Sequence, residues 1–261
     1  MKSGSKLPVV MTIAGSDSGG GAGIQTDLKT FTALKTFGTT AITCITAQNP
    51  CAVKGILPIA KNMVKLQIDT VCEGFHVVAA KTGMLFSVEI IRTVAKTLKA
   101  RRIKHLVVDP VMISTSGAAL LKESAVNALC KELLPMAEVI TPNLDEAGKL
   151  YGKRLSSLDD MKEAARFLGK KYDVACVVKG GHLSQKTGRG KGKVVDVLYQ
   201  SDKITEFWTD RVRAKTTHGT GCRFSSALTA YLANGISLPK AVGLSQRFVA
   251  GTLKEVSKCL T

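Results

Sequence analysis

The segment Thr217–Cys222, Thr-His-Gly-Thr-Gly-Cys, carries the clearest chemical signal in the sequence, because it stands directly before an expected helix. Amide groups at a helix N-terminus point outward, and two glycines allow a ligand to approach the backbone closely. We therefore expect Gly219, Thr220 and Gly221 to surround an anion or a developing negative charge. The same field is expected to lower the pKa of the Cys222 thiol, so that it can act as a base or nucleophile. The alternative is an ordinary helix start with an incidental cysteine.

Oxygen-bearing side chains follow two expected strands. Asp109 stands before Pro110 at the end of one strand, and Asn143 and Glu146 follow the end of another. Hard oxygen ligands of this kind suit Mg²⁺ and its bound waters. The spacing of Asn143 and Glu146 also fits a capping box at the start of a helix, and Asp109 also fits a residue that begins a turn.

Two further segments join glycines to a charged side chain. In Lys179–His182 a lysine precedes two glycines, which suits contact with a phosphate but also fits a turn with an exposed lysine. The segment Gly15–Gly23 is neither a Walker A loop nor a GxGxxG motif. Its glycines would let a ligand lie against the backbone, and Asp17 and Asp27 would bind a polar ligand there. The alternative is a tight turn between a strand and a helix.

Strands that alternate with helices connect these motifs. Strands are expected over residues 7–14, 39–47, 77–80, 106–109, 139–141 and 175–179, and helices over 24–35, 58–71, 88–98, 118–134, 145–151 and 158–171. This alternation predicts an α/β fold with a mainly parallel central sheet and helices on both of its faces. All four motifs fall at carboxyl ends of strands, where such sheets bind ligands. Together they would supply an anion pocket, oxygens for a divalent metal and a lysine for phosphate, as phosphoryl transfer requires.

The last third of the chain departs from this alternation. A loop is expected over 184–193, where glycines interleave with lysines and arginine, and it is expected to close over a bound nucleotide. A hairpin follows over 194–199 and 204–209, and two helices follow over 221–232 and 239–256. Because no linker or repeat interrupts the pattern, we expect residues 1–261 to form one domain.

The composition limits the classes of protein to which this chain can belong. Its 261 residues are 45% hydrophobic and 22% charged, which excludes an intrinsically disordered protein despite a formal net charge of +17. The longest apolar run, Val174–Val178, is far shorter than the roughly 20 residues that span a bilayer, so no membrane-spanning segment is expected. Seven widely spread cysteines without a CxxC pair argue against a disulfide framework or a zinc site, and we expect most of them to be buried thiols of a cytoplasmic protein.

The positive charge raises nucleic-acid binding as an alternative function. Twelve Lys and Arg residues accompany four Asp and Glu residues between positions 149 and 193. Specific binding usually adds aromatic stacking or a known reading element, but aromatic residues make up only 5% of this chain. We therefore expect weak, salt-sensitive adhesion to nucleic acid rather than specific recognition.

The motifs, taken in order, resemble those of one family. The segment Thr12–Asp27 is similar to the opening motif of the hydroxymethylpyrimidine/phosphomethylpyrimidine kinases of thiamine biosynthesis, which belong to the ribokinase-like superfamily. The family's further motifs follow in the same order, as Ala47–Asn49, Lys81–Met84, Asp109–Met112, Thr141–Asn143, Lys179–His182 and His218–Cys222. The resemblance covers nearly the whole chain. It implies phosphorylation, by ATP with Mg²⁺, of 4-amino-5-hydroxymethyl-2-methylpyrimidine and then of its monophosphate.

The resemblance also implies a role for each motif. The residues expected to contact the pyrimidine are Gly15, Asp27, Gln48, Met84 and Val111. The residues expected at ATP are Asn143, Lys179, Thr217 and His218, and those expected at Mg²⁺ are Asp109 and Glu146. The anion hole would consist of Gly219, Thr220, Gly221 and Cys222, with Cys222 where many relatives place an aspartate as general base. Relatives are commonly dimers, so a homodimer is expected.

Two questions stay open at this point, the role of Cys222 and the identity of the substrate. The thiol would either deprotonate the hydroxyl group or only position the substrate while the backbone amides stabilise the charge. In both cases Cys222→Ala is expected to reduce turnover far more than ATP binding. The nearest alternative function is that of a pyridoxal kinase of the same subgroup, because His218 and Cys222 would serve equally well to engage an aldehyde.

Overall fold

A computed structural model of the chain describes residues 7–112, 121, 123–181, 183, 192–212, 214 and 217–259, without the side chains of residues 123 and 255–259. Nine strands form one sheet in the order β3-β2-β1-β4-β5-β6-β7-β8-β9. The strands are β1 (Val9–Asp17), β2 (Phe37–Gln48), β3 (Val53–Pro58), β4 (Val77–Thr82), β5 (His105–Val108), β6 (Val139–Ile140), β7 (Ala175–Lys179), β8 (Lys193–Gln200) and β9 (Lys203–Asp210). The six strands from β2 to β7 in this order are parallel, and β3, β8 and β9 add antiparallel edges. The expected mainly parallel α/β sheet is confirmed.

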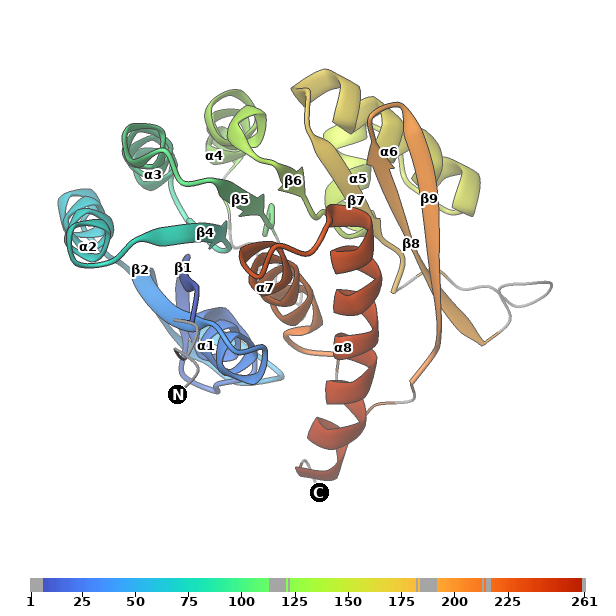
Figure 1. Ribbon diagram of the computed structural model, residues 1–261, viewed down its shortest axis with the longest axis horizontal. Coiled ribbons are helices and arrows are strands. Elements are labelled where there is room, and N and C mark those ends of the chain that lie inside the picture. Colours follow the sequence, from blue (N-terminus) through green and yellow to red (C-terminus); the bar gives the residue numbers. More distant parts are fainter. Residues whose placement is uncertain are drawn as a thin grey trace, which may run out of the picture.

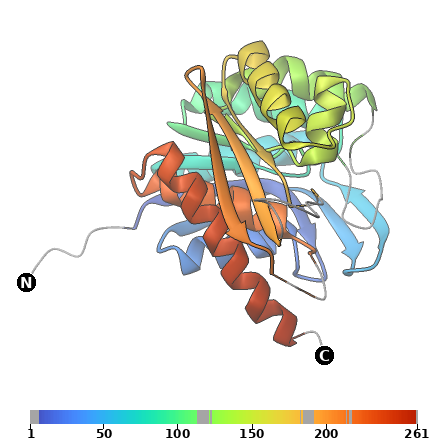
Figure 2. The same ribbon diagram turned by 90° about the vertical axis from the view of Figure 1, so that its right-hand side faces the viewer.

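Helices cover both faces of the sheet. The helices are α1 (Gly23–Ala33), α2 (Lys61–Gly74), α3 (Val88–Arg101), α4 (Glu123–Ala128), α5 (Leu144–Tyr151), α6 (Leu158–Tyr172), α7 (Thr220–Ala233) and α8 (Leu238–Cys259). Figure 1 shows α2 to α6 on one face and α1, α7 and α8 on the other. Turned by 90°, α8 lies across the β8–β9 hairpin (Figure 2).

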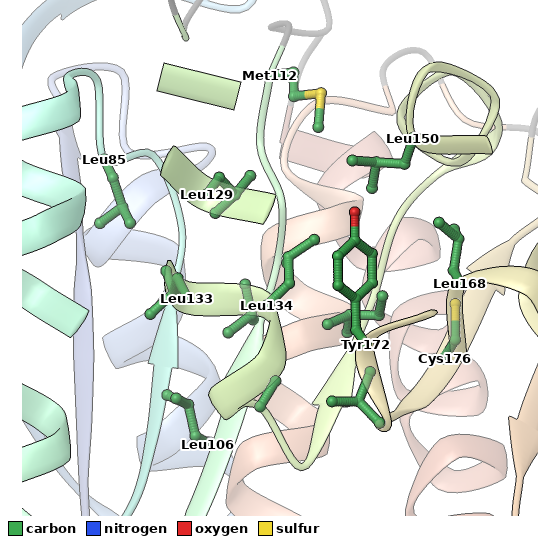
Figure 3. Close-up of a cluster of buried hydrophobic side chains, with 14 of the residues drawn as sticks. Leu85, Leu106, Met112, Leu129, Leu133, Leu134, Leu150, Leu168, Tyr172 and Cys176 are labelled. Atoms are coloured by element: carbon green, nitrogen blue, oxygen red, sulfur yellow. The ribbon is translucent and has the colours of Figure 1, made fainter. Parts of the chain in front are cut away.

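The larger hydrophobic core lies between the sheet and helices α2 to α6. Cys176 of β7 meets residues such as Leu133 and Leu168 there, all fully buried (Figure 3). Side chains in a strand alternate between the two faces, so the intervening residues point toward α7 and α8. Those residues form a second, smaller core together with apolar side chains of α7 and α8. Burial on both faces explains why these strands are continuous apolar runs.

The order of the strands reverses direction at β1, since β2 and β4 lie on either side of it. Ligands of such sheets bind outside the carboxyl ends of the strands at this point. β1 continues through the expected turn to Asp17, and its register with β2 shifts between Ala14 and Ser16. A bulge of this kind bends the strand and re-aims its last side chains. The irregular end of β1 thus lies where the sheet leaves room for a ligand.

The structure corrects three details of the expected elements. β3 was not expected, because a short strand with Gly55 inside and Pro58 at its end has little strand character, yet an edge position tolerates both. As a result α2 begins at Lys61 rather than at Pro58. The described part of the helix expected over 118–134 consists of α4, a π-helical turn at Leu129–Leu133 and a 3₁₀ turn that contains Pro135. The loop expected over 184–193 lies almost wholly outside the described residues.

Candidate active site

A cavity of about 460 Å³ opens at the carboxyl edge of the sheet, within the size range of small-molecule sites. Fourteen of the fifteen site residues expected from the sequence line it. They are Gly15, Gln48, Met84, Asp109, Val111, Asn143, Glu146, Lys179, Thr217, His218, Gly219, Thr220, Gly221 and Cys222. The exception is Asp27. Residues separated by up to two hundred positions therefore meet in one place, as the positions at strand ends predicted.

Polar side chains gather at this edge of the sheet because apolar residues give way to polar ones at the carboxyl ends of the strands. On the face covered by α7 and α8, apolar residues of five parallel strands are followed two positions later by polar ones. The pairs are Val10 and Thr12, Ala79 and Lys81, Val107 and Asp109, Val139 and Thr141, and Val177 and Lys179. Because residues i and i+2 share a face, each strand contributes one polar group to the same edge.

Asp109 and Lys179 form the first of two buried ion pairs. The Lys179 Nζ lies 2.9 Å from the Asp109 Oδ1, while Thr141 and Ser225 donate to the same carboxylate at 3.2 and 3.1 Å. Burial by itself would raise the pKa of Asp109, but the charges of Lys179 and Lys81 hold it below its usual range. Burial would likewise lower the pKa of Lys179, and Asp109 and Glu146 hold it above its usual range. The pair is therefore ionised at neutral pH.

Asn143 and Glu146 form the capping box of α5. The Asn143 side chain accepts a hydrogen bond from the Glu146 amide, and the Glu146 carboxylate accepts one from the Asn143 amide, both at 2.9 Å. The structural alternative weighed for this spacing is thus confirmed, although both residues also line the cavity. Burial raises the pKa of Glu146 to about 7, against the lowering effect of the nearby Lys179 charge. Glu146 is consequently part protonated at neutral pH.

Asp27 lies behind the cavity wall, where it forms the second ion pair with Lys81. The Lys81 Nζ lies 3.0 and 3.1 Å from the two carboxylate oxygens, and both side chains are 0% exposed. Thr12 and Ser226 donate to the same carboxylate, each at 2.6 Å. Direct contact between Asp27 and a pyrimidine, which the resemblance implied, does not fit this placement, because Lys81 stands between the carboxylate and the cavity that it lines.

The first turn of α7 forms the expected anion cradle. Helical hydrogen bonding begins with the Arg223 amide, which donates to the Gly219 carbonyl at 2.9 Å, so the Gly221 and Cys222 amides precede it. Gly219 has a φ of +77°, and a Cβ on it would lie 1.8 Å from the Gly21 carbonyl oxygen. Only glycine satisfies both conditions. The backbone of the cradle therefore packs directly against the glycine-rich turn that follows β1.

The expectation of a lowered pKa for Cys222 is wrong in this structure. Burial raises the pKa of the thiol to about 11, and Asp27 and Asp109 raise it further. The Lys81 charge and the Gly23 amide act in the opposite direction but do not overcome the loss of solvation. At neutral pH the side chain is therefore a thiol rather than a thiolate. A neutral thiol is a poor base, so the raised pKa disfavours deprotonation, the first of the two roles left open for Cys222.

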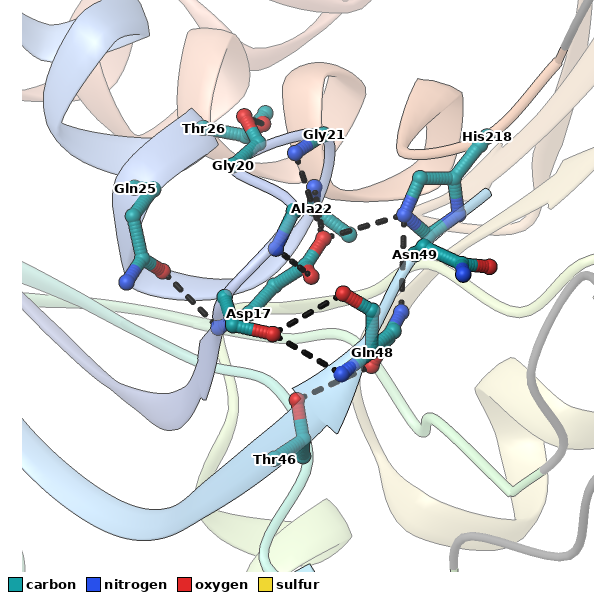
Figure 4. Close-up of polar contacts among 12 residues, drawn as sticks. Asp17, Gly20, Gly21, Ala22, Gln25, Thr26, Thr46, Gln48, Asn49 and His218 are labelled. Carbon is teal, nitrogen blue, oxygen red and sulfur yellow. Dashed lines mark hydrogen bonds and ion pairs between the residues drawn. The ribbon is translucent and has the colours of Figure 1, made fainter. Parts of the chain in front are cut away.

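Asp17, Gln48 and His218 meet at the mouth of the glycine-rich turn (Figure 4). The His218 Nε2 lies 3.0 Å from the Asp17 Oδ2 and 3.4 Å from the Gln48 Nε2. Asp17 also accepts hydrogen bonds from the Gly19 and Ala22 amides at 2.9 and 2.8 Å. Burial acts to raise the pKa of Asp17, but His218 and these amides hold it below the usual range. His218, which was expected at ATP, thus lies beside Gln48, which was expected at the pyrimidine.

An apolar pocket completes the same end of the cavity. Cys44 and Met84 form a small buried cluster, against which Val111 packs. A Cβ on Gly15 would lie 2.7 Å from the Cys44 sulfur, so glycine lets the backbone lie flat against this cluster. We call the region lined by Gly15, Gln48, Met84 and Val111 the acceptor end. We call the region around Lys179 the nucleotide end; both names follow the roles expected from the sequence. The cradle lies between the two, because Gly221 adjoins the Lys179 ammonium and His218, the residue before Gly219, contacts Gln48.

Two residues that line this cavity, Lys81 and Asp196, were given no role by the sequence. Asp17, which was expected to bind a polar ligand at the glycine-rich turn, lines the cavity as well. Asp196 lies opposite Lys179 in the β7–β8 pair and accepts a hydrogen bond from the Gly180 amide at 2.9 Å. A charged residue two positions after a buried apolar one, at the end of a strand, is the signal that would have found Lys81.

The described residues also bear on the other expectations. Among them, no three His, Cys, Asp or Glu side chains gather into a metal-binding cluster, and no helix has the length and apolarity needed to cross a membrane. Six cysteines are free thiols, of which Cys44 and Cys176 are buried. Cys51 is exposed, and Cys72, Cys130 and Cys222 are half-buried, so the expectation of mostly buried thiols is only partly correct.

Comparison with known proteins gives a consistent result. The family described as phosphomethylpyrimidine kinase matches residues 17–260. A hydroxymethylpyrimidine/phosphomethylpyrimidine kinase of Bacillus subtilis is 42% identical over 239 residues, which cover 92% of this chain and 86% of that protein. The thiamine biosynthesis bifunctional protein ThiED of Geobacter sulfurreducens is also 42% identical, over 94% of this chain, but the chain spans only 49% of that longer relative.

Two groups of solved structures share the fold. A phosphomethylpyrimidine kinase of Clostridium difficile aligns with a TM-score of 0.81 at 40% identity, over 94% of this chain and 99% of that one. A pyridoxal kinase of Staphylococcus aureus, in complex with AMP-PCP and pyridoxal, aligns with a TM-score of 0.85 at 38% identity, over 95% and 88% of the two chains. The expected ribokinase-like fold is confirmed by these structures.

Proposed function

We propose, from the premise that this chain belongs to the phosphomethylpyrimidine kinase family, that it phosphorylates 4-amino-5-hydroxymethyl-2-methylpyrimidine and then the resulting monophosphate, with ATP as donor. This reaction would belong to thiamine biosynthesis, the pathway that the name of the bifunctional relative of this chain gives. One observation carries the proposal furthest. The α7 cradle lies between the acceptor end, which offers the Gln48 amide and apolar side chains, and the nucleotide end, which offers Lys179. ATP and the acceptor molecule would therefore meet over the same backbone amides.

The nucleotide end offers the charges that phosphates require. Lys179 is paired with Asp109 and its side chain is 12% exposed, so its ammonium can exchange part of this contact for a phosphate oxygen. Mg²⁺ often binds through one or two carboxylates, with waters and substrate phosphates as its other ligands. Asp109 and Glu146 fit this pattern, since both line the cavity near Lys179 without a third acidic or imidazole ligand among the described residues. When bound, Mg²⁺ would neutralise phosphate charge there.

The acceptor end suits a flat heteroaromatic ring. The Gln48 amide can donate and accept in one plane against an aminopyrimidine edge, and Met84 and Val111 provide apolar surfaces for the ring. In the transfer itself, a lone pair of the hydroxyl oxygen forms the new P–O bond, and the bond from the γ-phosphorus to the bridging oxygen breaks with its electron pair left on ADP. The hydroxyl proton passes to an oxygen of the transferred phosphoryl group, and the raised pKa of Cys222 argues against this thiol as its acceptor. The Gly221 and Cys222 amides stabilise the charge of the transferred group.

The function is tested by turnover of three acceptors side by side. The purified protein is incubated with ATP and Mg²⁺ and with hydroxymethylpyrimidine, its monophosphate or pyridoxal, and products are identified by mass. We expect the pyrimidine diphosphate to form. Conversion of none of the three acceptors would refute the proposal, while conversion of the first pyrimidine alone would restrict it to the first phosphorylation.

A matched pair of glycine variants tests the role of the cradle in that reaction. Gly219 and Gly235 both have a φ of +77°, but only a Cβ on Gly219 meets another atom within 4 Å. Gly219→Ala is therefore expected to reduce turnover by about 100-fold or more, as loss of an oxyanion-hole donor does. Gly235→Ala carries the same backbone strain at the far end of α7 and is expected to keep turnover near that of the unmodified protein. Equal activities would refute a role for the cradle.

Pyridoxal phosphorylation is the second candidate function. It is favoured by the structural likeness to the pyridoxal kinase of Staphylococcus aureus and by the presence of His218 and Cys222 in the same cavity. Turnover of pyridoxal together with the pyrimidines would indicate dual specificity. Turnover of pyridoxal alone would keep the fold and the cradle but reassign the acceptor end.

We further propose that the protein is a cytoplasmic homodimer. Exposed apolar side chains gather on β2, β3 and α2, where Ile45, Leu57, Met63 and Leu66 are 47–63% exposed, and an apolar surface of this kind favours association. Free thiols in the described residues support a reducing compartment. Sedimentation of the protein and of Leu57→Lys tests the dimer, which the lysine is expected to weaken. A monomer at micromolar concentration would refute it.

A further inference from the structure

Lys81 is a buried cation of the cavity to which the proposed reaction has so far given no role. It ends the apolar run of β4, is 0% exposed and lines the cavity with Met84 and Cys222. Charged side chains are almost never fully buried unless they are paired. Here Asp27 provides the partner, and it raises the pKa of Lys81 although burial acts to lower it. Lys81 therefore keeps its positive charge inside the protein.

The Asp27–Lys81 pair is tied to the cradle through α7. Ser226, which donates to the Asp27 Oδ1 at 2.6 Å, stands four residues after Cys222, and residues at this spacing share one side of a helix. Thr12 of β1 donates to the other oxygen at 2.6 Å. The carboxylate thus joins β1, β4, α1 and α7 directly beneath the first turn of α7. Any movement of Lys81 relative to the cradle is opposed by these contacts.

The hydrogen bonds of the pair fix the position of the Lys81 ammonium. Asp27 accepts from Thr12, from Ser226 and twice from Lys81, which satisfies its two oxygens. An ammonium group has three N–H donors, and two of them account for the contacts with Asp27. Within the described part of the chain, the Lys81 ammonium hydrogen-bonds to Asp27, and the charges of Asp109 and Cys222 also act on it. Because Lys81 lines the cavity while its side chain is 0% exposed, its positive charge lies just behind the cavity surface, close enough to act on a ligand bound there.

We propose that Lys81 is a second cationic group of the active site, which faces the acceptor end and stabilises the negative charge on the phosphoryl group as it reaches the acceptor oxygen. This inference rests on the proposed kinase function. Lys179 meets the phosphates from the nucleotide end, and Lys81 meets the transferred group from the opposite end. Asp27 is the positioning residue that fixes the ammonium, without contact with the substrate.

Two variants separate the effect of the Lys81 charge on catalysis from its effect on the fold. Asp27→Asn keeps Lys81 and one acceptor oxygen, which can accept from either Thr12 or Ser226, while the hydroxyl of the other can turn to accept from the new amide NH₂. Adding Lys81→Met removes the cation and leaves a neutral, hydrogen-bonded residue in the place of Asp27. Replacement of both members of a buried pair by neutral groups is often tolerated by the fold. The same two substitutions at the surface pair Lys170–Asp202, 59% and 78% exposed, provide the matched control.

The test compares kcat and the KM for ATP in four proteins: the unmodified chain, Asp27→Asn, the Lys81→Met/Asp27→Asn double variant and the surface control. We expect the double variant to lose about 100-fold in kcat relative to Asp27→Asn, the size of one oxyanion donor, with little change in the KM for ATP. The surface control is expected to match the unmodified chain. Thermal unfolding and circular dichroism establish that each variant is folded.

Each outcome decides the question. Equal kcat values for Asp27→Asn and the double variant would show that Lys81 only supports the fold. If the double variant does not fold, Lys81→Gln replaces it, since an amide still donates to Asp27 but carries no charge. Failure of both neutral variants to fold would overturn the separation of charge from support. No turnover by the unmodified chain would instead refute the kinase function itself, which keeps the two failures distinct.

Discussion

The active site contains the same chemical unit twice, and the two copies differ in depth. Asp109–Lys179 and Asp27–Lys81 are both Asp–Lys pairs. Each carboxylate accepts from a threonine, Thr141 directly after β6 or Thr12 in β1, and from one of two consecutive serines on α7, Ser225 or Ser226. The Lys179 side chain is 12% exposed and its surroundings include Glu146, whereas both members of the other pair are 0% exposed. One pair can therefore release its lysine to a ligand, while the other holds its lysine in place.

This difference shows how one motif acquires two functions. A buried ion pair is a weak source of stability, because the loss of hydration offsets most of the attraction between the charges. Its value lies in a fixed charge at a chosen position, which stabilises a transition state without reorganisation. The Asp109–Lys179 pair, whose lysine is 12% exposed, gives up part of that fixed geometry in return for access to a phosphate group. The following variants are arranged to break or sharpen this comparison, from the largest expected effect to the smallest.

Removal of Lys81 alone should have the largest effect on stability. Lys81→Met leaves the Asp27 carboxylate buried without a counter-charge, which typically costs about 3–5 kcal/mol of unfolding free energy. Lys179→Met should cost less, because the Asp109 carboxylate, although only 2% exposed, keeps the charge of Lys81 nearby and a hydrogen bond from Ser225. Urea unfolding of the two variants, compared at constant m-value, measures the difference. A Lys179→Met variant as unstable as Lys81→Met would contradict the distinction in depth.

Removal of Lys179 should act on the nucleotide instead. Lys179→Ala is expected to weaken ATP binding by about 10–100-fold, the worth of a charge-assisted hydrogen bond, while binding of the pyrimidine changes little. Calorimetric titration with ATP and with the pyrimidine measures both affinities. Lys153→Ala, which removes an exposed lysine paired with Asp160, is the control and should bind ATP as the unmodified chain does. Unchanged affinity in Lys179→Ala would remove this lysine from the phosphate site.

The acidic neighbour of Lys179 should make stability depend on pH. Burial raises the pKa of Asp196 to about 6, so between the unfolded value of 3.8 and about 6 the folded protein binds the extra proton. Stability from this group is therefore present at low pH and is lost as the pH rises to about 6. Asp196→Asn should be more stable than the unmodified chain above pH 6, by roughly 1–3 kcal/mol, and equal to it below about pH 4. Urea unfolding from pH 4 to pH 8 tests this, and a constant difference across that range would argue against it.

The capping box beside the first pair should contribute the smallest effect. Asn143→Ala removes the acceptor for the Glu146 amide and is expected to cost about 1 kcal/mol of stability. Asn143→Ser retains a capping oxygen and should recover most of that loss, as thermal unfolding can measure. If Asn143 also contacts the nucleotide, ATP affinity falls in both variants. A loss of affinity in Asn143→Ala alone would mean that the residue acts on ATP only through the position of α5.

The sequence was sufficient to predict the α/β architecture and the place of the site. Apolar runs that end in glycine, aspartate or lysine marked the carboxyl ends of β1, β5 and β7, and parallel strands bring such ends together. The same patterns did not predict β3, because its side chains alternate poorly and its stability comes from pairing with β2. Nor did they place His218, whose contacts lie 170 and 201 residues away at Gln48 and Asp17.

By itself, then, the sequence determined which residues would gather at one edge of the sheet, because strand period and chain direction are local properties. Only the tertiary structure decided which lysine is covered and which is open, since Asp27 and Lys81 are 54 residues apart and meet under α7. The state of Cys222 was decided in the same way. A helix N-terminus favours the thiolate, but burial among carboxylates outweighs that local field, and solvation depends on the whole fold.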